Sequence, residues 1–340
     1  MNEIEKELER QQIMHRLKYE NFIKARDYIF AHGDDINRAW FRYLFEDNDT
    51  DNFLNVLQKY QHENGGFGGI YYEFDYTGPC LKSTEIAVKY ILNLKEKPPA
   101  NHPIIQNMMK YILGLYIPEI GNWGEVVVPE VNNGVHCCWI RYRGEDTTPI
   151  ENEDERIKKY KANEKVCFAA FVSYYSGLVP KELYRDIIKY PTEHILRYWD
   201  KNSPDYNKEI FDKGEPYDIE YFQWFVPCLK DKDTADKLTS ILCQNPTAFM
   251  ELDFARSDKD YVHLPCDVAE RPNSILYPAV RDLVLDSLKY RMAQQSYNGR
   301  WPLGWSFGDD EGLRKLQIGY ETYRTLDMLE KLDRFDMIER

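Results

Sequence analysis

Apolar residues recur at the spacing of an amphipathic helix through most of this chain. Near the N-terminus, Ile4, Leu8, Ile13 and Leu17 begin one broad stripe that runs to about Phe30. Residues three and four positions apart share one face of a helix, so this spacing predicts helices. The same periodicity predicts further helices over 52–61, 83–95, 103–116, 164–176, 181–198, 234–243, 275–294 and 314–332.

The alternation typical of β-strands is scarce. The clearest β-branched run is Val126–Val131, and Pro129 interrupts it. We therefore expect an all-α fold, with at most a short β ribbon in a loop. Residues 144–155 are acidic and predict a mobile flap. Long stretches rich in Gly, Pro, Asn, Asp and Tyr predict ordered, functional loops at 66–82, 118–163, 199–220 and 244–274.

A seven-residue pattern, Q-x-x-x-G-x-aromatic, occurs twice, near opposite ends of the chain. The two copies are Gln61–Phe67 and Gln295–Trp301, and a partial copy ends at Gly121–Trp123. The glycine allows a turn with positive φ after a helix, and the glutamine can bond backbone groups left free at helix ends. We therefore predict that the pattern holds helical hairpins together.

The glycine turns are spaced regularly enough to indicate a repeat. Gly65, Gly121 and Gly177 stand 56 residues apart, and the 122 residues from Gly177 to Gly299 fit two further units. Because one hairpin cannot bury its apolar face alone, neighbouring hairpins must stack, and a unit of about 57 residues makes about six of them. We predict one domain, residues 1–340, built as an α/α toroid with an inner and an outer ring of helices.

Charge and composition narrow the choice of partners. The net charge is −13, so nucleic acid and anionic membrane surfaces are repelled. No run reaches the length of a membrane span, and the charged N-terminus lacks the apolar core of a signal peptide. Seven cysteines without framework spacing fit reduced thiols. We expect a cytoplasmic protein that binds a small-molecule ligand, and the sequence leaves its oligomeric state open.

The repeated pattern resembles the QW motif of terpenoid cyclases and of protein prenyltransferase β subunits. The chain is also similar to an uncharacterised bacterial prenyltransferase-like group of the same superfamily. The similar segments are Gly65–Gly68 with Asp75, Pro79 and Ser83; Val128–Asn132 with His136 and Trp139; Asn163–Glu164; and Trp301–Asp310. This resemblance implies an α/α toroid with a central cavity lined by aromatic and acidic side chains.

The chain departs from the characterised families at their catalytic carboxylates. The D-x-D-D of protonating cyclases is missing, and Asp47–Asp51 is among the nearest strings. The D-D-x-x-D that holds magnesium and diphosphate fails at its last position in Asp34–Arg38 and in Asp309–Leu313. Cyclase or transferase chemistry would therefore rest on the fold alone.

Asp309 and Asp310 are candidate catalytic residues. They follow Trp301 and Trp305, candidate ligand-binding residues, and precede a helix expected near Leu313. Acids at a helix start often only cap it. The functional interpretation places both carboxylates at the mouth of a cavity, where unequal surroundings would suit acid–base work.

A second group of candidates follows the first glycine turn. Asp75 is the candidate catalytic residue there, and Tyr72 and Glu73 are candidate ligand-binding residues. Carboxylates beside tyrosines suit hydroxyl-rich ligands, and they suit a solvated loop nearly as well.

The third group is centred on His136, which can act as a general base near neutral pH. Trp139 and Arg141 stand close to it in sequence and are candidate ligand-binding residues. Glu164 begins the next expected helix and is either a cap or a site residue.

No cofactor is predicted. Zinc accepts histidine, cysteine and aspartate ligands, which makes His136, His263 and Cys266 the weak metal candidates. Their spacing matches no recognised zinc pattern.

The sequence does not decide whether the protein is an enzyme. The first hypothesis, by resemblance, is a protein that binds or transforms an isoprenoid-like or other apolar ligand. One alternative is a carbohydrate-active lyase or hydrolase, which would need a pair of carboxylates at a fixed separation. The other alternative is a non-catalytic scaffold or binding protein.

Overall fold

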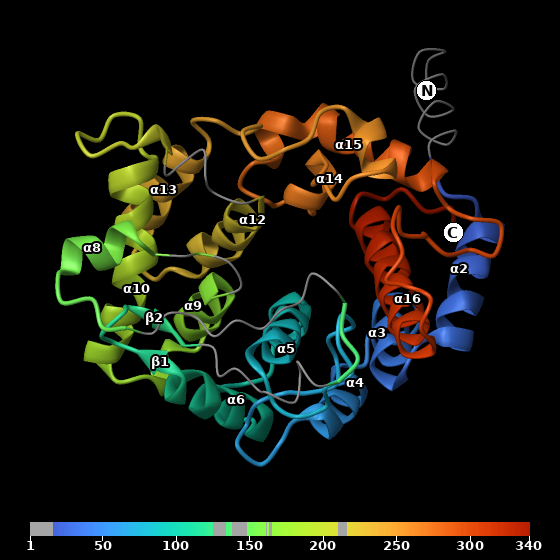
Figure 1. The fold of residues 1–340 in the computed structure, drawn as a ribbon, viewed down its shortest axis with the longest axis horizontal. Coiled ribbons are helices and arrows are strands. Elements are labelled where there is room, and N and C mark those ends of the chain that lie inside the picture. The colour runs from blue at the N-terminus through green and yellow to red at the C-terminus, as the bar shows by residue number, and fades with distance from the viewer. Residues whose placement is uncertain (1–15, 125–133, 138–147, 161, 163–164, 210–215) are drawn as a thin grey trace. The chain divides into compact units, whose positions relative to one another are not determined.

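The computed structural model describes residues 16–124, 134–137, 148–160, 162, 165–209 and 216–340, and these are mainly α-helical (Figure 1). Among these residues the only paired strands are β1 (Tyr116–Ile117) and β2 (Asn122–Trp123), an antiparallel pair around Gly121. The expected all-α class is confirmed for the described residues. Residues 126–131, the β-branched run, lie outside the described part of the chain.

The chain divides into two compact units. One combines Met1–Val56 with Met250–Arg340, and the other is Leu57–Phe249. Because the first unit draws on both ends of the chain, its core depends on contacts between residues far apart in sequence.

The last helix of the first unit, α16, connects the N-terminal and C-terminal parts of that unit. In the described part of this unit, α16 packs against α2 and α3. Next to this contact, the Leu17 amide donates to the carbonyl of Met337 at 2.8 Å, and the Glu339 amide donates to the carbonyl of Leu17 at 2.9 Å. The helices of this unit are α2 (Tyr19–His32), α3 (Asp35–Phe45), α4 (Thr50–Leu57), η5 (Phe254–Asp258), α14 (Pro265–Val268), α15 (Tyr277–Ala293) and α16 (Glu311–Arg334).

The second unit is organised around α9, whose residues are buried from Lys165 to Ser173. A helix that is buried on every side must be surrounded, and α5, α10 and α12 all pack against it. The helices of this unit are η1 (Gln58–Tyr60), α5 (Leu81–Asn93), α6 (Pro103–Gly114), α8 (Glu153–Lys158), α9 (Lys165–Tyr174), η2 (Ser176–Leu178), α10 (Lys181–His194), the π-helical turn η3 (Ile195–Trp199), α12 (Pro216–Phe225), η4 (Val226–Cys228) and α13 (Lys232–Leu242).

The first copy of the repeated pattern joins three segments of the second unit. Gln61 Nε2 donates to the carbonyl of Gly65 at 3.1 Å and to that of Ile104 at 3.0 Å, in the first turn of α6. Gly65 has φ +91°, as the turn requires. The Phe67 amide donates to Thr84 Oγ1 in α5 at 3.0 Å.

The second copy repeats these contacts in the first unit. Gln295 Nε2 donates to the carbonyl of Gly299 at 2.9 Å and to that of Asn21, in the first turn of α2, at 3.0 Å. The Trp301 amide donates to Thr325 Oγ1 in α16 at 3.1 Å. Matching bonds at corresponding positions confirm that the pattern fastens helices to one another.

The partial copy and Gly177 behave differently. Gly121 has φ +65°, and the Trp123 indole donates to the carbonyl of Ile112 at 2.9 Å, so this turn keeps part of the arrangement. Gly177 lies in η2 and is not among the positive-φ residues of the described chain. Its even spacing in the sequence therefore does not mark an equivalent turn.

Several helices lie where the sequence analysis placed loops or marked no element. The regions predicted as irregular contain α8, the short η5 and α14, and the first half of α12, and α3 was not predicted at all. Asp34 caps α3 by accepting from the Asn37 amide at 2.9 Å. The acidic string Asp34–Arg38 is therefore a helix start. Within the described chain, no helix is both long enough and apolar enough to cross a bilayer.

Candidate functional site

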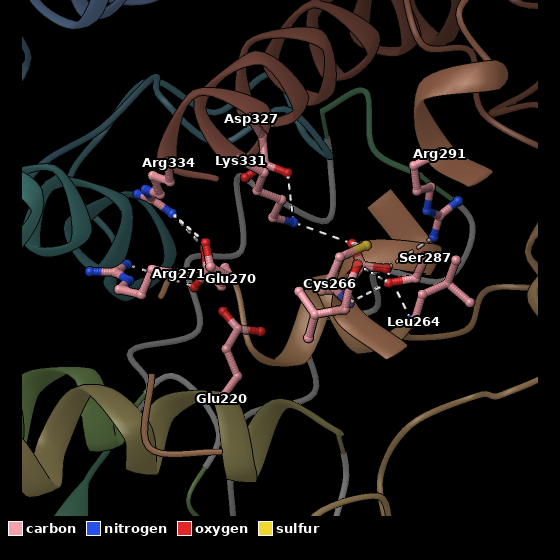
Figure 2. A network of polar contacts seen from close by, with 12 residues as sticks. Glu220, Leu264, Cys266, Glu270, Arg271, Ser287, Arg291, Asp327, Lys331 and Arg334 are labelled. Carbon is pink, nitrogen blue, oxygen red and sulfur yellow. Dashed lines mark hydrogen bonds and ion pairs between the residues drawn. The ribbon is translucent and has the colours of Figure 1, made fainter. Parts of the chain in front are cut away.

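A cluster of charged side chains lies between α14, α15 and α16 of the first unit (Figure 2). Asp267, in the single turn of α14, is its centre. Its carboxylate accepts from Arg291 Nη2 of α15 at 3.0 Å and from Lys331 Nζ of α16 at 3.2 Å. It also accepts from the Leu264 amide at 3.0 Å, which fixes the start of α14.

The charges in this cluster stabilise one another. Burial alone would raise the pKa of Asp267, but Lys331, Arg291 and His263 hold it well below its ordinary value. Burial opposes the charge on Lys331 too, yet Asp327 and Asp267 keep its pKa well above the usual range. These groups therefore stay ionised at every ordinary pH.

A second set of ion pairs continues along α16. Arg334 Nη1 lies 3.2 Å from Glu270 Oε2, and its other terminal nitrogen pairs with Glu330. Glu330 also accepts from the Trp40 indole at 2.9 Å. Arg271 pairs with Glu270 at 3.9 Å. This set anchors α16 to α3 and to the segment that follows α14.

The cluster follows a polar stripe on α16. Tyr320, Arg324, Asp327, Lys331 and Arg334 are spaced by four, three, four and three residues, which places them on one helix face. This stripe is a signal that the sequence analysis missed. The apolar residues were the more visible pattern. They lie on the opposite face of α16, which buries residues such as Leu326, Leu329 and Leu332.

Arg324 differs from its neighbours on the stripe. Its side chain is half-buried, and no hydrogen bond or ion pair joins it to another described residue. Burial lowers its pKa, and the charge of Arg291 lowers it further, while Asp267 partly offsets both. The stripe thus contains one guanidinium whose charge is not matched by a contacting carboxylate.

Aromatic side chains lie beside the charged cluster. Tyr261 packs edge-on against Trp305 at 5.4 Å between ring centroids, and against His263 at 5.3 Å. Tyr320 of the polar stripe packs against Phe307 at 5.6 Å. Of these rings, Tyr261 is 54% exposed. The predicted residues Trp305 and His263 therefore both contact Tyr261.

The other predicted residues of the first unit support the fold. Asp310 caps α16 by accepting from the Gly312 amide at 2.8 Å, while Asp309 is exposed. The capping interpretation thus describes Asp310. Trp301 is fully buried, and its indole donates to the carbonyl of Arg291 at 2.7 Å. Trp301 therefore stabilises the end of α15 from within the core, and its side chain is not accessible to a ligand.

The second unit brings Glu73, Asp75 and His136 together. The Asp75 amide donates to the carbonyl of Val135 at 3.0 Å, and the Cys137 amide donates to that of Glu73 at 2.9 Å. His136 forms an antiparallel bridge with Phe74, so its backbone lies beside that of the two acids, while successive side chains alternate between the two faces. Asp75 is exposed, and Glu73 and His136 are half-buried, so these three residues can meet solvent.

Tyr72 lies next to this group and is half-buried. Its neighbour Tyr71 donates to Glu73 Oε2 at 2.7 Å. The predicted residues Trp139, Arg141 and Glu164 lie outside the described residues.

Metal ligands do not gather at the predicted positions. Among the described residues, no group of three or more His, Cys, Asp or Glu side chains could hold a metal ion. Cys266 is fully buried, and burial together with Asp267 raises the pKa of its thiol to about 12. His136 and His263 belong to different units. Zinc at these residues stays a prediction of the sequence.

A second buried ionic group lies between α5 and α12 of the second unit. Lys89 Nζ is 3.1 Å from Glu85 Oε1 and 3.5 Å from Glu220 Oε1. Tyr221 donates to Glu85, and Lys89 lies 4.6 Å from the centre of the Tyr221 ring. Sequence reasoning missed this pair of carboxylates, because the two residues are far apart in the chain.

Comparison of the chain with models of protein families, with curated proteins and with solved structures finds no match. The site must therefore be interpreted from its own chemistry.

Proposed function

We propose that this protein is an α/α toroid of the prenyltransferase and terpenoid cyclase type. It binds a small, partly apolar ligand at the face of its first unit formed by α14, α15 and α16. The observation that carries this proposal is the position of Tyr320. It lies on the same face of α16 as the charged residues, and its ring packs against Phe307. Ligand sites commonly combine such apolar walls with a few placed charges.

Two features favour the toroid. The repeated pattern makes the same set of hydrogen bonds in both units. In addition, α2 and α16, the first and last helices of the described chain, pack together. Stacked hairpins whose last member meets the first make a closed ring.

The ligand class comes from the resemblance and from the rings. Tyr261 and Trp305 offer apolar area with little conformational entropy to lose, which suits the branched chain of an isoprenoid. The ligand is isoprenoid-like or another apolar molecule, bound next to fixed charges. A cytoplasmic location fits this reading.

Titration with an isoprenoid alcohol such as farnesol tests the proposal. We expect saturable binding, measured by tryptophan fluorescence and by the shift in melting temperature. Trp305→Ala should weaken binding about 2–10-fold, the equivalent of one aromatic contact. Tyr297→Ala is the matched control, since that ring is 91% exposed in the same unit. Equal affinity in the Trp305 variant would place the ligand elsewhere, and no binding at all would favour the scaffold alternative.

The carbohydrate alternative has one specific observation in its favour. Glu85 and Glu220 come from different helices and both lie within 3.5 Å of the Lys89 amino group, which holds two carboxylates in one place. The test is cleavage of a mixed set of oligosaccharides by the protein and by Glu85→Gln and Glu220→Gln. Loss of cleavage in both, with activity kept in the exposed control Glu96→Gln, would support this function.

A further inference from the structure

We propose that Gln317 and Glu321 of α16 are positioning residues for Trp305, one of the rings of the proposed ligand site. They hold the segment that carries Trp305, and they thereby fix the wall against which an apolar ligand packs. This inference rests on the proposed function, because it identifies the residues that set the shape of the same site.

The segment 301–307 lies along α16 and is bonded to three successive turns of that helix. Three of its backbone amides donate to side chains of α16, namely Trp301 to Thr325 Oγ1 at 3.1 Å, Leu303 to Glu321 Oε1 at 3.5 Å and Phe307 to Gln317 Oε1 at 3.0 Å. The three acceptors are spaced by four residues, so they share one face of the helix. The segment therefore runs antiparallel to α16.

The spacing of these bonds makes the chain bow outward between Leu303 and Phe307. Their acceptors, Glu321 and Gln317, are four helical residues apart, which is about 6 Å along the helix axis. Four residues of extended chain span about 13 Å. The excess length has to leave the helix surface, and Trp305 is at the middle of this bow, between two exposed residues.

Gln317 and Glu321 are bonded to each other as well as to the segment. Gln317 Nε2 donates to Glu321 Oε1 at 3.2 Å, and Glu321 Oε2 lies 2.9 Å from Arg300 Nε. The Glu321 side chain is only 6% exposed. A buried carboxylate is costly unless its oxygens have partners, so the loss of the Gln317 amide would disturb the bonds of Glu321 too.

The bow meets the loop that carries Tyr261. Trp305 packs edge-on against Tyr261, with 5.4 Å between ring centroids. The backbone of Gly304 lies so close to this loop that a Cβ there would be 2.8 Å from the Asp258 carbonyl oxygen. Asp258 is fixed to α15, because its carboxylate accepts from the Tyr290 hydroxyl at 2.7 Å. The two rings are thus held by separate helices, and the bonds to α16 set the position of Trp305 relative to Tyr261.

An exchange of donor and acceptor tests the role of the pair. In Gln317→Glu, a carboxylate still accepts from the Phe307 amide, but it repels Glu321 instead of donating to it. In the double variant Gln317→Glu with Glu321→Gln, the new amide donates to the new carboxylate, so the bond is restored in reverse. Lys315→Gln is the matched control, because Lys315 is exposed on the same helix and the net charge changes by the same unit.

The first readout is fluorine NMR of protein labelled with fluorotryptophan, without ligand. The Trp305 resonance is assigned from its absence in Trp305→Phe. We expect one narrow Trp305 resonance in the wild type, in the control and in the double variant, and a shifted or broadened one in Gln317→Glu. Gln317→Ala removes both bonds without adding charge and should behave like Gln317→Glu. Trp40, buried in the same unit, should keep its resonance, which a general loss of folding would not allow.

The second readout is titration with farnesol. Gln317→Glu should bind farnesol about 2–10-fold more weakly than the wild type, as expected for the net effect of one hydrogen bond, and the double variant should recover the affinity. An unchanged Trp305 resonance in Gln317→Glu overturns the proposal, and so does a double variant that fails to restore it. Equal farnesol affinity despite an altered resonance overturns the role in ligand binding. If the resonance responds as expected but even the wild type does not bind farnesol, the positioning of Trp305 stands and the apolar ligand class of the proposed function fails.

Discussion

Removing the negative charge of Asp267 should strongly destabilise the first unit, because the carboxylate pairs with two buried cations. Asp267→Asn keeps the size of the side chain and leaves Arg291 without its only described carboxylate contact. Breaking a buried ion pair by removing one partner costs about 3–5 kcal/mol. Lys331 keeps Asp327 at 2.9 Å, so we expect the lower end, about 3 kcal/mol.

Urea unfolding followed by circular dichroism at pH 7 measures this loss, and hydrogen exchange of α16 localises it to the first unit. Asp282→Asn is the matched control. Asp282 is on α15, its side chain is 90% exposed, and its replacement should change stability by less than about 0.5 kcal/mol.

The pH dependence of this stability difference follows from the direction in which folding shifts the pKa of Asp267. The pKa of Asp267 is lower in the folded than in the unfolded state, where it is about 3.9. Its contribution is therefore complete above about pH 5 and is lost progressively as the pH falls further. The gap between wild type and Asp267→Asn should be constant from pH 7 to about pH 5 and should narrow at lower pH. A loss below about 1 kcal/mol at pH 7 would contradict the reasoning, since it would mean that water already satisfies both cations.

Three further predictions concern stability. Burial lowers the pKa of His194 to about 4, although its bond to the Ile157 carbonyl partly opposes this, so the second unit should lose up to about 3 kcal/mol between pH 6.5 and 4. A His194→Gln variant should melt with a flatter pH profile over that range. Gly299→Ala should cost about 2 kcal/mol or more in thermal unfolding, because φ is +93° and the new methyl would meet backbone at 2.3 Å. Gly177→Ala meets nothing within 4 Å and should be nearly neutral. Asp310→Ala should cost about 1 kcal/mol as a lost helix cap, and Asp309→Ala almost nothing. If both replacements lowered stability equally, Asp310 would not be the cap of α16.

Local patterns predicted the helices well where the apolar period was long. The expected helix over 103–116 is α6, Pro103–Gly114, and the one over 275–294 is α15, Tyr277–Ala293. The short helices α8 and α14 were not predicted, because one or two helical turns contain too few apolar positions to show a period. The repeated glutamine and glycine pattern was interpreted correctly, since its chemistry is satisfied by nearby backbone groups.

The candidate site, by contrast, was predicted poorly from local patterns. Sequence reasoning brought forward Asp309 and Asp310 because two acids stood beside two tryptophans, yet Asp310 caps a helix. It named His263 and Cys266 for their metal-binding chemistry and gave Asp267, next to them, no role of its own. What makes Asp267 important is its contact with Arg291 and Lys331, which lie 24 and 64 residues away.

The sequence by itself determined the helical class and the hairpin fastenings, because helix periodicity and turn chemistry act between residues close together in the chain. The tertiary structure alone decided which charges meet. Whether a buried lysine or arginine has a carboxylate within reach depends on helices that pack from distant parts of the sequence. The pairing of Asp267 with Arg291 and Lys331 is an example, because 24 and 64 residues separate the partners and no local pattern could have shown it.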